Sequence, residues 1–388
     1  SGLKRCSVLQ GGSGRLYRQT IPAFKAQDVV STFQHRRRIC DGHKKRSRDD
    51  HLEMRFIALR CKDTIAPTGT IAQGVGAKQV NSLGEVYETK YGLTTSERVY
   101  GTVMENLEGR GPCYLRTEGI SPQQDESLRK AYLNMAPSQT LKWVEAGKNP
   151  SEQNVEIEGT EPYIVGGHTA SGYWVNTERE TTIHGLYAAG DVAGGCPQKY
   201  VTGAMVEGEI AAIDMVSKLD ADTSDGSFDT SAFDEKKALE AKASEYDHFL
   251  TERSKMFTTE AIEEAMQKVM DNYAGGISTH YQFNGKQLAL AKEKINHLIE
   301  LTGDLYASDM HELMFIYELK ERLTVCLSVI AHLGARKETR WHSFAENLDY
   351  PGKSDDWMKY VNSRYENGQL HMIYRELVGR EARYEHND

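Results

Sequence analysis

One stretch of the sequence carries residue types that could hold a cofactor. Leu186 to Ala189 form a short apolar run that predicts a buried strand, and Gly190 and Asp191 follow it before a glycine-rich turn. A glycine lets a ligand approach the backbone closely at a strand end, and an aspartate accepts hydrogen bonds from hydroxyl groups. A plain strand–turn–helix unit with Asp191 as a cap would explain the same residues.

The turn is expected to lead into a helix from about Thr202 to Val216, because apolar residues recur there at helical spacing. The first turn of such a helix offers free N–H groups and the positive end of the helix dipole. That end suits the N1–C2=O side of a flavin, which gains negative charge on reduction. The Gly-Asp pair with its glycines is only moderately specific for such a site, and the whole string from Thr181 to Gly195 is much more so.

The composition argues against several other classes of protein. The 388 residues include 47 Lys+Arg and 56 Asp+Glu, and the net charge of −9 disfavours binding to nucleic acid. No run approaches the roughly 18 uninterrupted apolar residues that a membrane-spanning helix needs. The six cysteines are scattered without a CxxC pair, which argues against a disulfide framework, a zinc site or an iron–sulfur cluster held by this chain alone. We therefore expect a cytoplasmic protein with reduced thiols.

The stretch GLYAAGD at residues 185–191 resembles the second FAD motif of the flavoproteins that include fumarate reductase, succinate dehydrogenase and adenylylsulfate reductase. The resemblance is closer to the alpha subunit of adenylylsulfate reductase. It is carried by EMRFIALRCKD at 53–63, EPYIVGGH at 161–168 and GYWV at 172–175, which occur in the expected order. The resemblance implies an FAD-dependent oxidoreductase subunit whose partner is an iron–sulfur beta subunit.

The resemblance also implies which residues form the site. A small anionic substrate would be reduced or oxidised at N5 of the flavin. Arg60 and Arg98 match arginines that hold the anion, and His168 matches a histidine that can donate a proton, although ordinary structural roles are an alternative for all three. The residues expected to bind the cofactor are Gly11, Gly12, Gly190, Asp191, Val201, Thr202, Gly203 and Glu207.

The expected fold is an α/β FAD-binding domain, present in part, with an α+β capping domain and a C-terminal helical domain. The FAD-binding domain would be made of residues 1–23 and 163–218, and the capping domain of residues 53–162, with a hairpin at 80–87. The helical domain would span 219–388. Its helices are predicted from apolar stripes at 262–273, 288–299 and 313–330.

Residues 24–52 form an anomalous basic segment with almost no periodic apolar face. Codons can be chosen for this segment so that reading them one nucleotide later gives an amino-acid sequence similar to that of the family. We therefore interpret the segment as the product of a frameshift. A genuine basic insertion is the alternative. A frameshifted segment should pack poorly, because its apolar pattern was never selected. The GxGxxG turn that opens such domains is absent, so the sequence is expected to be N-terminally incomplete.

Two departures from the family leave the substrate open. Ala72 and Gln73 stand where adenylylsulfate reductases place bulky apolar groups around the adenine. No arginine lies in residues 72–78, where fumarate reductases carry the arginine that delivers a proton. Two alternatives stay open. One is a fumarate reductase or succinate dehydrogenase type of flavoprotein acting on a dicarboxylate, and the other, supported by the missing GxGxxG turn, is an inactive truncated fragment without FAD.

Overall fold

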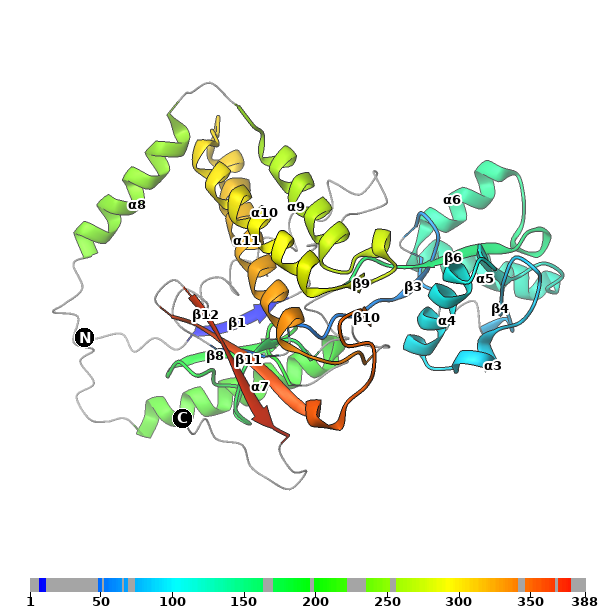
Figure 1. Ribbon diagram of the computed structural model, residues 1–388, viewed down its shortest axis with the longest axis horizontal. Helices are drawn as coiled ribbons and strands as arrows, with labels where there is room; N and C mark the ends of the chain where they lie inside the picture. Colours follow the sequence, from blue (N-terminus) through cyan, green and yellow to red (C-terminus); the bar gives the residue numbers. More distant parts are fainter. Residues whose placement is uncertain are drawn as a thin grey trace.

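The structure is a computed structural model, and it has two parts joined by extended segments (Figure 1). We call residues 59–159 the cap lobe and the remainder the base. The described residues are 7–11, 48–50, 52–64, 66–68, 74–162, 170–195, 199–221, 235–251, 256–340, 346–366 and 369–377.

The cap lobe combines an antiparallel sheet with helices. Its strands lie in the order β3-β6-β5-β4, with all neighbours antiparallel. Capping boxes at Thr94 and Ser121 begin α4 and α5, because each side chain accepts a bond from the backbone three residues later. The elements are β3 Leu59–Cys61, β4 Lys78–Val80, α3 Glu88–Tyr91, α4 Thr95–Leu107, β5 Cys113–Arg116, α5 Pro122–Met135, α6 Pro137–Ala146, η2 Pro150–Glu152 and β6 Val155–Gly159.

Among its described residues, the base contains three small sheets. β1 pairs in parallel with β8, β10 pairs with β9, and a four-stranded sheet has the order β12-β11-β2-β7. The long helix α7 follows β8. The elements are β1 Ser7–Gly11, β2 Arg48–Asp50, β7 Gly172–Tyr173, β8 Leu186–Gly190, α7 Tyr200–Ala221, β9 Gln282–Phe283, β10 Glu346–Asn347, η7 Asp355–Trp357, β11 Lys359–Glu366 and β12 Gln369–Glu376.

Four further helices stand above these sheets (Figure 1), and three of them confirm the apolar stripes read from the sequence. The α9–α11 helices pack against one another through their buried stripes. Among the described residues, no helix is both long and apolar enough to cross a membrane. The elements are α8 Glu235–Leu250, α9 Thr259–Tyr273, η4 Ile277–Thr279, α10 Gly285–Leu301, η5 Thr302–Asp304 and α11 Met310–Ala335.

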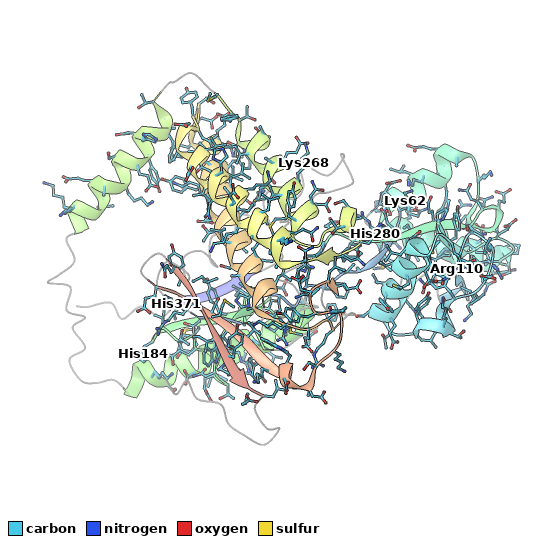
Figure 2. The ribbon with its side chains drawn as sticks, in the orientation of Figure 1. Lys62, Arg110, His184, Lys268, His280 and His371 are labelled. Carbon is cyan, nitrogen blue, oxygen red and sulfur yellow. The ribbon has the colours of Figure 1, made fainter. Side chains whose placement is uncertain are left out.

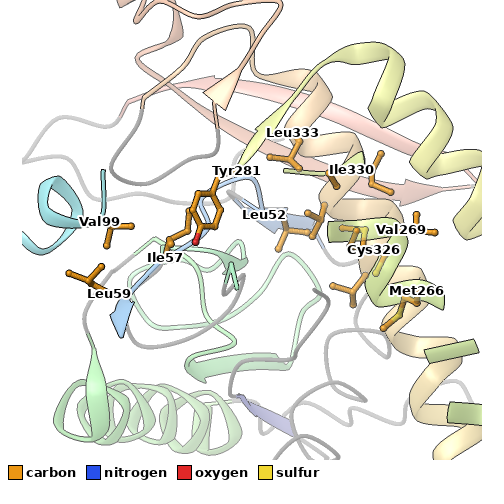
Figure 3. Packing of buried hydrophobic residues seen from close by; sticks show 14 of the residues in the cluster. Leu52, Ile57, Leu59, Val99, Met266, Val269, Tyr281, Cys326, Ile330 and Leu333 are labelled. Atoms are coloured by element: carbon orange, nitrogen blue, oxygen red, sulfur yellow. The ribbon is translucent and has the colours of Figure 1, made fainter. Parts of the chain in front are cut away.

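One hydrophobic cluster continues from the cap lobe into the base (Figure 3). Leu59 and Val99 lie at its cap end, and Ile57 and Tyr281 lie where the lobes meet. A Cβ on Gly159 would come within 2.2 Å of the Tyr281 hydroxyl, which donates to the backbone carbonyl oxygen of the neighbouring residue Thr160 at 2.9 Å. The close fit at this junction fixes how β6 leaves the cap lobe.

The expectation of a helical domain up to residue 388 is wrong for residues 359–376. β11 and β12 pair in antiparallel register over eight residues each, with Glu366 opposite Gln369. β11 also pairs with β2, from the distant N-terminal part of the chain. This pairing with a remote strand outweighs the local preference, and the sequence carries the typical hairpin signal Asn367-Gly368 between the two strands.

Two further expectations are met only in part. The predicted hairpin at 80–87 is a tight turn with one bridge between Val80 and Val86, after which α3 begins. Within the basic segment 24–52, residues 48–50 pair with strands on both sides and Leu52 is 1% exposed, so poor packing is wrong for these residues. Residues 24–47 lie outside the described part.

A buried carboxylate joins several elements of the cap lobe. Glu105 in α4 is 1% exposed and accepts hydrogen bonds from Asn81 Nδ2 at 2.9 Å and Tyr91 at 2.8 Å. It also accepts from Nε of Arg110 at 2.6 Å, and Figure 2 shows Arg110 within this lobe. The bonds from Arg110 hold the pKa of the Glu105 carboxyl well below its usual range.

We expect Glu105→Gln to lower the free energy of unfolding by about 2 kcal/mol at neutral pH, because charge-assisted bonds are lost. The native pKa is lowered, so this contribution is complete above the unfolded pKa near 4.5 and disappears as pH falls toward the native value. Urea unfolding of variant and wild type at pH 7 and at about pH 3.5 tests this. Glu108→Gln, whose side chain is 40% exposed, is the control. An equal loss at both pH values would contradict the prediction.

Candidate functional site

Gly190 and Asp191 lie where β8 ends and the chain turns toward α7. Gly190 has φ +73°, and a Cβ there would lie 3.2 Å from the Cβ of Ala204 in α7. Glycine therefore allows both the turn and the close approach of the helix. β1 runs beside β8 with Gly11 opposite Gly190. Two glycines predicted as site residues from distant parts of the sequence are therefore neighbours at the ends of these two strands.

The turn after Asp191 is held by β7. The N–H of Tyr173 donates to Val192 at 2.7 Å, and the N–H of Gly194 donates back to Tyr173 at 2.8 Å. Gly172 has φ +155°, and a Cβ there would lie 2.4 Å from the carbonyl oxygen of Val192. The backbone of β7 thus packs directly against the turn and fixes its course.

Three charged side chains lie beside this turn. Nζ of Lys199 donates to the carbonyl oxygens of Gly190, at 2.8 Å, and Ala193. Oε2 of Glu207 lies 3.3 Å from the same Nζ and accepts from the N–H of Gly190 at 2.8 Å. Oε1 of Glu207 pairs with Arg179 at 3.2 Å. The carboxylate of Glu207 is therefore used by the protein itself, which gives it a supporting role.

Burial raises the pKa of the Asp191 carboxyl above its ordinary value, and the positive charge of Lys199 acts in the opposite direction. Asp191 is half-buried. An ionised carboxylate at this position accepts hydrogen bonds from the hydroxyl groups of a sugar-like chain.

The first turn of α7 faces solvent. Val201 is 75% exposed and Thr202 is exposed as well. N–H groups in the first turn of a helix have no acceptor within that helix, so these two residues can offer donors at the positive end of the dipole. Gly203 differs, because its N–H donates to the carbonyl of Lys199 at 2.7 Å and a Cβ on it would lie 3.0 Å from the Lys199 side chain. Its lack of a side chain makes room for Lys199.

These features fit a flavin with its ribityl chain. The glycine turn, the carboxylate of Asp191 and the helix N-terminus supply close approach, an acceptor and donors, which are the three things that such a cofactor needs here. Within the described residues, no group of three or more His, Cys, Asp and Glu side chains is placed to hold a metal ion.

Arg60 lies in β3 of the cap lobe and is engaged in ion pairs. Its guanidinium lies 3.2 Å from Glu158, the residue opposite it in β6, and 3.1 Å from Glu161, and the side chain is 3% exposed. Two carboxylates engage its terminal nitrogens Nη1 and Nη2, so the structure gives Arg60 an evident structural role.

Arg98 has a different environment in α4. The residue is half-buried, and its Nε is buried without a hydrogen-bond partner among the described residues. β3 and α4 both belong to the cap lobe and lie apart from β8 and α7 (Figure 1), so Arg60 and Arg98 are not brought to the glycine turn. His168 and Gly12, two further predicted site residues, lie outside the described residues.

Sequence reasoning missed Lys199 and Arg179. A signal was available for Lys199, because a lysine directly before a helix start opposes the helix dipole and so needs an acidic partner. Glu207, two helical turns later, provides that partner. Arg179 reaches the site from a loop, and its sequence position gives no such indication.

No protein-family model matches the chain. The adenylylsulfate reductase subunit alpha of Megalodesulfovibrio gigas is 28% identical over 377 residues, which covers 81% of this chain and 56% of that protein. The structure of adenylylsulfate reductase from Archaeoglobus fulgidus matches with a TM-score of 0.82 and 28% identity, over 95% of this chain and 66% of that one. The chain thus spans little more than half the length of the curated relative.

A quinol fumarate reductase of E. coli has a TM-score of 0.74 over 98% of this chain and 67% of its own, at 16% identity. At that identity the match concerns the fold alone. By sequence and by fold, the chain is similar to the alpha subunit of adenylylsulfate reductase.

Proposed function

We propose that the chain is part of an FAD-dependent oxidoreductase subunit of the adenylylsulfate reductase alpha type. It would reduce or oxidise a small anionic substrate at N5 of the flavin, and an iron–sulfur beta subunit would exchange electrons with it. The observation that carries this proposal is the glycine turn with Asp191 at the start of α7, found in a homologue of that subunit. A related structure contains adenosine-5-phosphosulfate reductase with sulfite as a covalent adduct.

FAD would supply the redox chemistry, and the residues of this chain would bind and orient it. Asp191 would accept bonds from the ribityl hydroxyls, while the N–H groups of Val201 and Thr202 would face the edge that gains negative charge. We propose one FAD-binding domain from residues 1–23 and 163–218, with 53–162 as its cap. Arg98 and His168 would act on the anion at the end of the flavin that reaches the cap, rather than at the glycine turn, where cap and FAD-binding domain face each other.

The three described cysteines, Cys61, Cys113 and Cys326, are buried free thiols. Burial raises the pKa of Cys61 to about 12 and of Cys113 to about 11, so neither is an attacking thiolate at neutral pH. These thiols support placing the protein in a reducing compartment such as the cytoplasm, and they leave the flavin as the redox centre of the proposal.

The test is to mix the purified chain with excess FAD and to record the absorption spectrum after gel filtration. We expect a flavin spectrum that elutes with the protein, and a decrease of its long-wavelength band on titration with sulfite. Asp191→Ala should weaken FAD binding about tenfold, through the loss of a charged acceptor. Colourless protein would contradict the proposal. Bound flavin that ignores sulfite but oxidises a dicarboxylate would favour the fumarate reductase alternative.

A further inference from the structure

A buried lysine supports the turn between β8 and α7. The Lys199 side chain is 3% exposed, and its Nζ donates to the carbonyl oxygens of Gly190, at 2.8 Å, and Ala193. These two residues lie on either side of Asp191 and Val192, so a single ammonium group ties both ends of the turn. Lysine is rarely buried without such partners.

The charge of Lys199 is balanced by Glu207 rather than by the helix. A cation directly before a helix start opposes the dipole, so this placement is unfavourable for α7 alone. Glu207 compensates it at 3.3 Å and, through the same oxygen, binds the N–H of Gly190 at 2.8 Å. Arg179 pairs with the other oxygen of Glu207 at 3.2 Å, so Glu207 is fixed from both sides.

We infer that Lys199 is a positioning residue for the cofactor, holding the Gly190–Ala193 turn so that Asp191 and the first N–H groups of α7 face the ligand. This inference rests on the proposed function, because the ligand is FAD. Lys199 has a second effect through its charge. The charged groups that act on Asp191 are Lys199, which lowers the pKa of its carboxyl, and Glu207, which raises it.

Removing the lysine charge should therefore raise the pKa of Asp191, so that the carboxylate is lost at a higher pH. As the pH is lowered, Lys199→Met should therefore lose FAD affinity at a higher pH than the wild type does. A residue that only stabilised the fold would lower stability without moving this midpoint.

The experiment compares Lys199→Met, Lys199→Arg and Lys218→Met in the full 388-residue chain. Lys218 is the control, a lysine in α7, the helix that Lys199 precedes. It pairs with Asp214 at 2.8 Å and Glu180 at 2.7 Å and bonds to the Tyr187 hydroxyl at 3.2 Å, and none of these residues belongs to the Gly190–Ala193 turn. FAD affinity is measured by fluorescence titration between about pH 4 and 8. Hydrogen exchange of peptides covering residues 186–195, followed by mass spectrometry without FAD, reports the turn itself.

We expect Lys199→Met to bind FAD about tenfold more weakly at pH 7, to move the acid midpoint up by about half a unit, and to exchange at Gly190 about tenfold faster. Lys199→Arg should keep the midpoint of the wild type, because it keeps the charge, and should lose about threefold in affinity, because a guanidinium cannot bind both carbonyls in the same way. Lys218→Met should change none of the three quantities.

Unchanged affinity and midpoint in a folded Lys199→Met would overturn the inference. If Lys199→Met does not fold, the test uses Lys199→Arg. Exchange rates and FAD affinity equal to those of the wild type in Lys199→Arg would then overturn the inference. If the wild-type chain takes up no FAD, the proposed function fails separately. The exchange rates then still decide whether Lys199 holds the turn, since equal rates at residues 186–195 would exclude it.

Discussion

Glu53→Gln is expected to lower the free energy of unfolding by about 3 kcal/mol, the typical effect of removing one partner from a buried ion pair. Glu53 is 1% exposed and lies just before the segment that enters the cap lobe. Its Oε1 accepts from Nε of Arg336 at 2.9 Å, and its Oε2 lies 3.0 Å from Nδ1 of His332. The carboxylate therefore contacts the imidazole of His332 in α11 and the guanidinium of Arg336, the residue that follows α11.

The expected loss of stability is large because His332 and Arg336 are buried, so water cannot replace the lost carboxylate. His332 is 0% exposed, and its Nε2 lies 2.8 Å from the hydroxyl of Ser363 in β11, which is also 0% exposed. Arg336 keeps its bond to Glu338 at 2.9 Å and its bonds to two backbone carbonyls. A neutral amide at position 53 leaves a buried guanidinium with less compensation, which is more costly than the lost hydrogen bond itself.

Thermal and urea unfolding of Glu53→Gln measure this effect. The control is Glu376→Gln in β12, whose side chain is 82% exposed and lies 3.6 Å from Lys359. An exposed pair of this kind contributes about 0.5 kcal/mol or less. A loss below about 1 kcal/mol for Glu53→Gln would mean that the network does not hold the base together.

The order of groups in this network, serine, histidine and carboxylate, is that of a hydrolase triad. The burial of all three excludes such a role in this conformation, because no substrate can reach Ser363. The same geometry here connects three distant parts of the chain: Glu53 precedes the cap lobe, His332 lies in α11 and Ser363 in β11. Access to solvent, rather than the arrangement alone, separates the structural use of these groups from the catalytic one.

The sequence predicted elements whose cause is local. The stripes of α9 and α11 repeat every three to four residues, and the Gly190-Asp191 turn follows a short apolar strand, so both could be read directly. β11 could not be read in this way. Its middle residues are buried against β2 and β12, and the pairing with β2 spans about three hundred residues of sequence. The local sequence signal for this hairpin is the Asn-Gly pair at 367–368.

The residues of the candidate site also differ in whether their positions depend on local or on long-range contacts. Asp191 and the start of α7 are adjacent in sequence, and their common location at the end of β8 was predictable. The environment of Arg60 was not, because Glu158 and Glu161 become its partners only when β6 pairs with β3. A family resemblance can indicate that an arginine occupies a matching position, but long-range pairing decides how many of its donors are already used.

Arg98→Met is expected to weaken sulfite binding by flavin-loaded protein about a hundredfold while leaving stability nearly unchanged. One charged donor to an anion contributes on the order of 3 kcal/mol in a site shielded from water. Nε of Arg98 is buried without a hydrogen-bond partner among the described residues, so its removal breaks no bond there. Methionine fills similar space and takes away an unsatisfied buried donor, which offsets the lost contacts.

Arg60→Met should give the opposite pattern, because it leaves Glu158 and Glu161 without their partner and should lower stability by about 3 kcal/mol. Sulfite titration at the flavin band and urea unfolding of both variants measure the two effects separately. Lys62→Met, at a side chain that is 42% exposed and pairs with Glu156, is the control for a lost positive charge in this lobe. If Arg98→Met instead lost stability and kept sulfite affinity, Arg98 would be structural.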